Sequence, residues 1–83
     1  GQVASETGSP TTTTRFVLNE TQNVRIALYD LLGRRVRVVR DEEIPEGLEQ
    51  SVRVRTSTLS SGPYFLRFTG EQFAATRKIV VVN

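Results

Sequence analysis

The sequence predicts an all-β protein, an antiparallel β-sandwich of about six or seven short strands. Two observations support this fold class: apolar and polar residues alternate with a period of two from Thr13 onward, and turn residues interrupt the alternation about every eight to twelve residues. No helical period extends over a full window. With 83 residues, the chain is long enough for one small domain.

Residues 1–12 are small and polar and include Gly8, Ser9 and Pro10, a composition typical of a linker or leader. The sandwich is therefore expected over residues 13–83.

The first two strands are expected over residues 13–19 and 24–30. In the first, Phe16 and Leu18 share the inward face. The second shows the clearest alternation, with polar or small residues between its apolar ones. Its inward residues are expected to be Val24, Ile26 and Leu28.

Residues 30–34 are expected to turn the chain, with Gly33 at the positive φ that a tight connection needs. A third strand is expected over residues 35–40, and residues 41–47 form an acidic loop around Pro45. In this strand the inward valines Val36 and Val38 alternate with Arg35 and Arg37.

The second half of the chain continues the pattern with strands over residues 48–55 and 63–69, joined by a Ser/Thr/Gly crossover. Leu48 is expected to start the inward face of the earlier strand, and Leu59 to close one end of the core. The other inward residues are expected to be Val52, Val54, Tyr64, Leu66 and Phe68.

The last strand is expected within residues 72–82, but its alternation is inconsistent. Arg77 shares parity with the apolar residues Phe73, Ile79 and Val81, whereas Lys78 shares parity with Val80 and Val82. A β-bulge, or a strand buried on both faces, would remove the conflict.

Composition excludes several kinds of chemistry, because the chain has no Cys, His, Met or Trp. Thiolate nucleophiles, Ser–His triads, Cys/His zinc sites and disulfides are impossible, so no catalytic, cofactor-binding or metal-ligating residue is expected. Four acidic residues lie close together, but their spacing indicates neither a carboxylate pair nor a calcium loop. We interpret them as a charged hairpin tip: Asp41, Glu42, Glu43 and Glu46.

The net charge of +2 comes from ten arginines and one lysine against nine acidic residues. Six arginines on outward positions suggest a basic face, but no base-reading motif accompanies them, so nucleic acid is not expected as a partner. An ion-paired, solvated face is favoured, and anionic lipopolysaccharide is the ligand that would fit it. No apolar stretch reaches transmembrane length. The six arginines are Arg25, Arg35, Arg37, Arg53, Arg55 and Arg67.

Four sequence blocks resemble a known family when they are taken together, in order and at this spacing. The blocks are Pro10–Phe16 (PTTTTRF), Val24–Arg34 (VRIALYDLLGR), Gly62–Phe65 (GPYF) and Arg77–Val81 (RKIVV). They resemble the C-terminal sorting domain of type IX secretion, over about residues 9–83. That family is in turn similar to the immunoglobulin-like domain of the flagellar hook-capping protein.

The resemblance implies a seven-stranded immunoglobulin-like sandwich at the C-terminus of a larger secreted protein, often a polysaccharide-degrading enzyme. It implies passage through the periplasm and outer membrane, with the outer-membrane export machinery and a sortase-like protease as partners. The cargo is then linked to surface lipopolysaccharide. The module is expected to be monomeric, without cofactor or enzymatic activity. Its motif residues are Gly33, Arg34, Gly62, Tyr64 and Lys78.

Each motif residue also has a purely structural interpretation. Gly33 suffices as a turn former, and Tyr64 is expected in the core with its hydroxyl bonded to a backbone group. The sequence departs from the family in its leader, where an Asn-Pro-Phe-Asn-Pro-like stretch is reduced to Gly8-Ser9-Pro10, so no cleavage position follows. It also departs at Pro63, where the family has an apolar residue.

Two alternative functions remain open. One is a carbohydrate-binding module of a secreted hydrolase, although Trp is absent and few aromatics are expected to face outward. The other is a structural immunoglobulin-like module. The candidate outward aromatics are Tyr29, Phe65 and Phe73.

Overall fold

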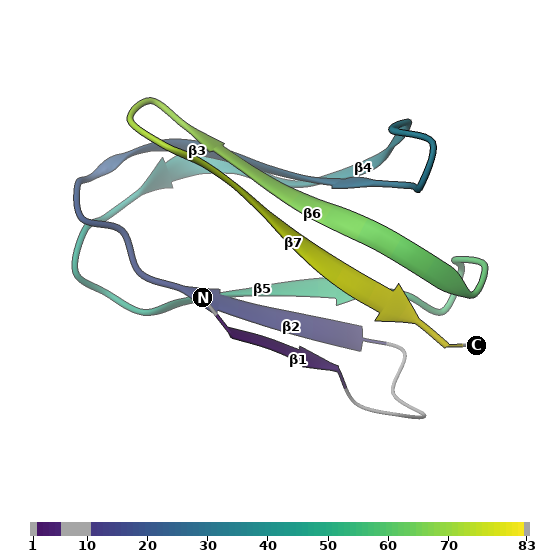
Figure 1. The fold of residues 1–83 in the computed structure, drawn as a ribbon. Helices are drawn as coiled ribbons and strands as arrows, with labels where there is room; N and C mark the ends of the chain where they lie inside the picture. Colours follow the sequence, from purple (N-terminus) through teal and green to yellow (C-terminus); the bar gives the residue numbers. More distant parts are fainter. Residues whose placement is uncertain (1, 6–10, 83) are drawn as a thin grey trace.

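The computed structural model describes residues 2–5 and 11–82, with side chains described from Thr11 to Val82. These residues form two antiparallel β-sheets that face each other (Figure 1). The strands are β1 (Gln2–Ser5), β2 (Thr11–Phe16), β3 (Gln22–Tyr29), β4 (Arg35–Ile44), β5 (Gln50–Arg55), β6 (Gly62–Gly70) and β7 (Ala74–Val81).

One sheet has the order β1-β2-β5 and the other the order β4-β3-β6-β7. This arrangement corresponds to an immunoglobulin sandwich in which the fourth strand pairs with the third strand instead of the fifth. The prediction of an all-β antiparallel sandwich is therefore confirmed.

The core lies between the two sheets and is built from the inward positions that the alternation predicted. Val24, Ile26 and Leu28 of β3 are fully buried, and Leu66 of β6 is buried beside them. Leu59 packs against this core from the β5–β6 connection, as expected. The remaining buried members of the core are Leu18, Ile44, Val52, Val54, Phe68 and Ile79.

The predicted acidic loop is wrong, because β4 continues through residues 41–44 and pairs with β3 as far as Ile44 opposite Gln22. Ile44 is only 1% exposed, whereas Leu48, which was expected to face inward, is 60% exposed. The hairpin therefore buries the apolar residue before its turn and leaves the one after it in solvent.

The expected inward valines of β4 are also wrong. The β3–β4 register shifts between Ile26 and Ala27, so that Val39 is an extra residue on β4. Val39 packs on the core while Val36 and Val38 are exposed.

The parity conflict in the last strand has a different solution from the two that were expected. β7 pairs with β6 in an uninterrupted register and is buried on one face, with Ile79 and Val81 inward. Arg77 occupies an inward, half-buried position in the middle of β7, and Val80 is left in solvent.

The six arginines do not form one face. Arg53 and Arg55 lie on β5 in one sheet, while Arg25 and Arg67 lie on strands of the other sheet. Arg37, expected outward, is half-buried, and its Nη1 donates to the carbonyl of Arg55 at 2.9 Å.

The expected leader, residues 1–12, lies partly outside the described residues. Within it, Gln2–Ser5 pairs with β2, and Thr11 and Thr12 already belong to β2. A run of β-branched threonines favours extended structure, which accounts for the earlier start of this strand.

Candidate functional site

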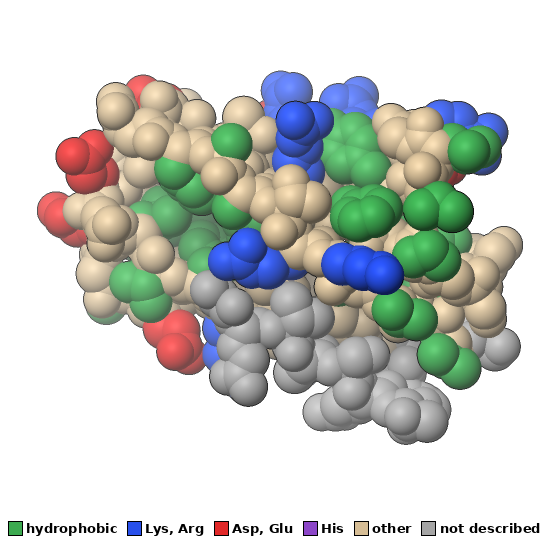
Figure 2. All heavy atoms as spheres, in the orientation of Figure 1, with side chains coloured by type: hydrophobic (Ala, Val, Ile, Leu, Met, Phe, Trp, Pro, Cys, Tyr) green, Lys and Arg blue, Asp and Glu red, His purple; other side chains and the backbone are tan. Residues whose placement is uncertain are grey.

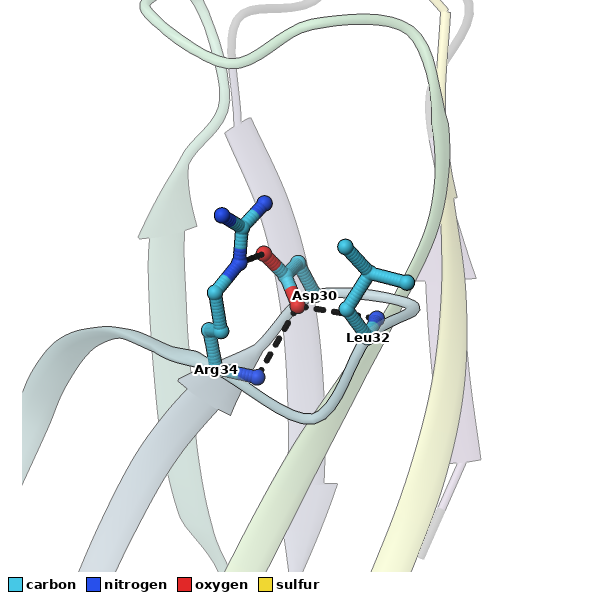
Figure 3. Close-up of polar contacts among 3 residues, drawn as sticks. All are labelled: Asp30, Leu32 and Arg34. Carbon is cyan, nitrogen blue, oxygen red and sulfur yellow. Dashed lines mark hydrogen bonds and ion pairs between the residues drawn. The ribbon is translucent and has the colours of Figure 1, made fainter.

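The β3–β4 turn is organised by the carboxylate of Asp30, which accepts three hydrogen bonds within five residues (Figure 3). Its Oδ1 accepts from the backbone N–H groups of Leu32 and Arg34, both at 2.9 Å. Its Oδ2 accepts from the Arg34 Nε at 2.9 Å. The side chain thus replaces backbone partners that the turn residues lack.

These contacts lower the pKa of Asp30. The Arg34 backbone N–H has the largest effect, and the Arg34 guanidinium and the Leu32 N–H act in the same direction, against a smaller opposing effect of partial burial. Asp30 therefore stays ionised to a lower pH than an ordinary aspartate does, and its hydrogen bonds continue to hold the turn there.

Gly33 completes this turn at a φ of 81°, as the sequence predicted. Its N–H donates to the Asp30 carbonyl at 3.0 Å, and the Asp30 N–H donates to the Arg34 carbonyl at 3.0 Å. A Cβ placed on Gly33 would meet no atom within 4 Å outside its chain neighbours, so the glycine is required by backbone conformation and not by space.

The β5–β6 connection lies beside this turn. The Tyr64 hydroxyl donates to the Ser60 carbonyl at 2.9 Å, which is the tyrosine corner of immunoglobulin-like folds. Gly62 precedes Tyr64 at a φ of 142°. The two segments enclose a groove of about 320 Å³, and we call residues 30–34 and 60–64 the Tyr64 end.

The Tyr64 end presents apolar side chains on a fixed support. Leu31 and Leu32 are 67% and 75% exposed, and the exposed Arg34 guanidinium pairs with Asp30 in the same turn. Exposed leucines on an ordered turn favour contact with another protein surface.

The structure brings four of the five motif residues together at this end: Gly33, Arg34, Gly62 and Tyr64. Lys78 lies apart, on β7 opposite Phe65. Figure 2 shows hydrophobic side chains exposed among basic ones over β6 and β7.

The acidic residues of β4 form surface contacts. Asp41 pairs with Arg25 at 3.2 Å, and Glu42 pairs with Arg40 at 3.5 Å. Among the described residues, no three Asp or Glu side chains are grouped as metal ligands would be. The same part of the chain contains no helix with the length and hydropathy of a membrane span.

The described residues thus define the class of the protein by its fold, a small immunoglobulin-like β-sandwich with a tyrosine corner and an exposed leucine turn. Comparison with known families gives the particular one: residues 9–82 match the secretion system C-terminal sorting domain, and the chain belongs to this family. No curated protein and no solved structure matched the chain significantly.

Membership of this family gives the module a function. It is a C-terminal type IX export signal of a secreted protein, which it directs to the cell surface or the extracellular space. The signal interacts with the type IX secretion machinery, and the family is a sorting domain and not a catalytic one.

Sequence reasoning missed Asp30, the residue that organises the turn. The signal was present in the segment Asp30–Arg34. An aspartate at the start of a turn commonly accepts a hydrogen bond from the backbone N–H two residues later, and here a glycine follows three residues after it. The prediction for this turn used the glycine alone and left out the side chain of Asp30.

Proposed function

We propose that the export machinery binds the Tyr64 end, with Leu31 and Leu32 as the apolar contact and Arg34 beside them. The observation that carries this proposal is the exposure of two adjacent leucines on a turn held by three side-chain hydrogen bonds. A preorganised contact loses little conformational entropy on binding, which favours recognition of a folded signal.

The test is export of a reporter protein fused to residues 1–83 in a bacterium with type IX secretion. The double variant Leu31→Ser/Leu32→Ser is expected to leave the reporter in the periplasm. Leu48→Ser is the matched control, because Leu48 is also an exposed leucine in a β-turn but lies at the other end of the sandwich. The control is expected to be exported like the wild type.

Both variants change exposed residues, so the free energy of unfolding of each is expected to stay within about 0.5 kcal/mol of the wild-type value. Urea titration measures this free energy. Export of the double variant at the wild-type level would rule out the leucine contact. Retention of the unchanged fusion in the cell would rule out export by this chain altogether.

We further propose that the host is a polysaccharide-degrading enzyme, and that a sortase-like protease removes the domain before the cargo is joined to anionic lipopolysaccharide. The family match supports this sequence of steps. Removal would shorten the exported fusion by up to 9.3 kDa, the mass of the chain. A cell-bound reporter of unchanged mass would contradict removal, and free release into the medium would contradict attachment.

One observation supports carbohydrate binding as a second candidate function. Tyr29 and Phe65 are paired in register on the outer face of the four-stranded sheet, and the Arg67 guanidinium lies 5.9 Å from the Tyr29 ring centroid. Phe73, the third candidate, packs against the core instead. Affinity electrophoresis tests this function: retardation by a polysaccharide that Phe65→Ala abolishes would support it, and unchanged mobility would exclude it for that polysaccharide.

A further inference from the structure

The four-stranded sheet (Figure 1) has an outer face, away from the core, on which a row of side chains crosses all four strands. Tyr29 of β3 pairs in register with Arg35 of β4 and with Phe65 of β6. Phe65 pairs in turn with Lys78 of β7. Two half-buried aromatic side chains therefore lie between two exposed cations, and we call these four residues the cross-strand row.

Apolar pairs flank the cross-strand row on both sides. On one side, Val38 of β4 pairs with Ala27 of β3 and is 42% exposed. On the other side, Pro63 of β6 pairs with Val80 of β7, which is 51% exposed. The row thus lies at the centre of an apolar strip on an ordered sheet, and exposed apolar strips of this kind favour contact with another protein surface.

Three cations of this face have no acidic partner. Arg35, Arg67 and Lys78 are exposed, and none of them makes an ion pair with another described residue. The Arg67 guanidinium lies 5.9 Å from the centroid of the Tyr29 ring, so it belongs to the same strip.

The acidic residues of the outer face lie farther along β4, away from the Tyr64 end. Asp41 is opposite Arg25 and already pairs with it at 3.2 Å. Glu43 is opposite Asn23, near the far end of the hairpin. The positive charge around the cross-strand row is therefore uncompensated within the described residues, and a surface that carries carboxylates is its complement.

The outer face of the other sheet provides a comparison. Arg53 and Arg55 are also exposed on outward positions of β5 and make no ion pair with a described residue. Their outward neighbours on β5 and β2 are polar, namely Ser51, Thr11 and Thr13. The combination of unpaired cations with an exposed apolar strip thus distinguishes the four-stranded sheet.

The cross-strand row is continuous with the Tyr64 end. Tyr29 and Arg35 directly flank the turn of residues 30–34, and Pro63 also lines the groove of that end. A stable interface buries about 800 Å² on each partner, and two leucine side chains provide only a small part of such an area. A partner that binds the exposed leucines can gain the remaining area from the outer face beside them.

We propose that the partner surface that binds the Tyr64 end extends over this outer face and is acidic. Its carboxylates meet Arg35, Arg67 and Lys78, and its apolar side chains cover the aromatic pair between them. This inference rests on the proposed function, since it assigns a charge and a second contact to the same protein partner. A glycan is a poorer complement, because sugars stack on exposed aromatic faces and the exposed apolar groups here are valines.

Charge variants of the reporter fusion test the acidic partner. Arg35→Glu/Lys78→Glu places carboxylates against those of the partner and is expected to lower the exported fraction by at least about tenfold. Arg35→Gln/Lys78→Gln removes the attraction without adding repulsion, so its loss is expected to be smaller. Arg35→Lys/Lys78→Arg keeps both charges and is expected to export more than this neutral pair. The matched control is Arg53→Glu/Arg55→Glu, which makes the same charge change on the other sheet and is expected to be exported like the wild type.

All of these variants change exposed residues, so their urea midpoints are expected to equal that of the wild type. Should the charge reversal lower the midpoint, the difference between the neutral and the charge-conserving pairs decides instead. Export of the charge-reversed fusion at the wild-type level would overturn the inference, and so would an equal loss in the control. Release of the charge-reversed fusion into the medium, where the unchanged fusion stays on the cell, would assign the face to an anionic surface glycan and would also overturn it.

The leucine and charge variants together separate this inference from the proposed function. Retention of Leu31→Ser/Leu32→Ser with normal export of the charge-reversed pair would leave the leucine contact standing and remove the acidic partner surface. Retention of the charge-reversed pair alone would assign recognition to the outer face and remove the leucine contact.

Discussion

The two ends of the sandwich are held together in different ways. At the Tyr64 end, the side-chain hydrogen bonds join residues two to four positions apart, as between Asp30 and Leu32 or Tyr64 and Ser60. At the other end, which we call the Gln22 end (residues 17–22, 45–49 and 70–73), a local bond from Gln22 Nε2 to the Glu20 carbonyl is joined by bonds that span the chain. The Gln72 N–H donates to Gln22 Oε1 across 50 positions, and the Glu46 N–H donates to Thr21 Oγ1 across 25.

This difference has a consequence for a sorting signal. Local contacts need little loop closure, so the Asp30 turn forms as soon as its own five residues are ordered. The Gln22 end forms only when β3, β4 and β6 have assembled. The Asp30 turn, which carries the proposed leucine contact, therefore depends less on the rest of the fold than the Gln22 end does.

The largest effect is expected next to the Gln22 end, at Ile44, the last residue of β4, which is buried and pairs in register with Gln22. Ile44→Ala leaves a cavity in a thin core and is expected to lower the free energy of unfolding by about 2–5 kcal/mol. Leu48→Ala, four residues later and exposed, is expected to change it by less than about 0.5 kcal/mol. Urea denaturation measures the free energy of unfolding of both variants. Equal losses of stability would contradict the burial of Ile44 and the exposure of Leu48.

A smaller effect is expected at the Tyr64 end from Gly33→Ala. A Cβ at a φ of 81° costs about 1–2 kcal/mol, and the surroundings of Gly33 offer no steric reason for a larger loss. Gly33→Asn is expected to lose less, since asparagine tolerates this conformation. Urea denaturation measures both losses. An alanine variant as stable as the wild type would show that the turn can change its conformation freely.

Much of the fold could be predicted because the alternation of apolar and polar residues along a strand indicates directly which side chains face the core. The inward face of β3 and the conformation of Gly33 follow from neighbouring residues alone. The bounds of β4 could not be predicted, since residues 41–44 look like a polar loop until they pair with β3. Val39 faces inward because of a register shift between β3 and β4. Such a shift depends on the partner strand, so it cannot be predicted from the sequence of β4 alone.

The candidate site divides in the same way. Gly33 and Tyr64 were predictable as a turn former and a hydroxyl bonded to backbone, and both predictions are confirmed. Their meeting in one groove depends on the pairing of β3 with β6, which are far apart in the chain, in the four-stranded sheet.

The smallest effect, and the sharpest test of the difference between the two ends, is the pH dependence of the Asp30 turn. Because the pKa of Asp30 is lowered in the folded state, chiefly by the Arg34 backbone N–H, its charge adds stability above the pKa of an unfolded aspartate. That contribution is lost as the pH falls through the folded-state pKa. Asp30→Asn keeps an acceptor oxygen but not the charge, so its stability is expected to fall less steeply on acidification.

Urea midpoints from about pH 7 to about pH 2 measure this slope. Asp41→Asn is the matched control, because it removes one carboxylate from an exposed ion pair on the same hairpin and leaves the turn intact. Parallel curves for Asp30→Asn and the wild type would show that neutral hydrogen bonds alone hold the turn. A flatter curve for Asp30→Asn, with Asp41→Asn retaining the slope that Asp30 provides, would show that the charge of Asp30 holds the turn at the Tyr64 end.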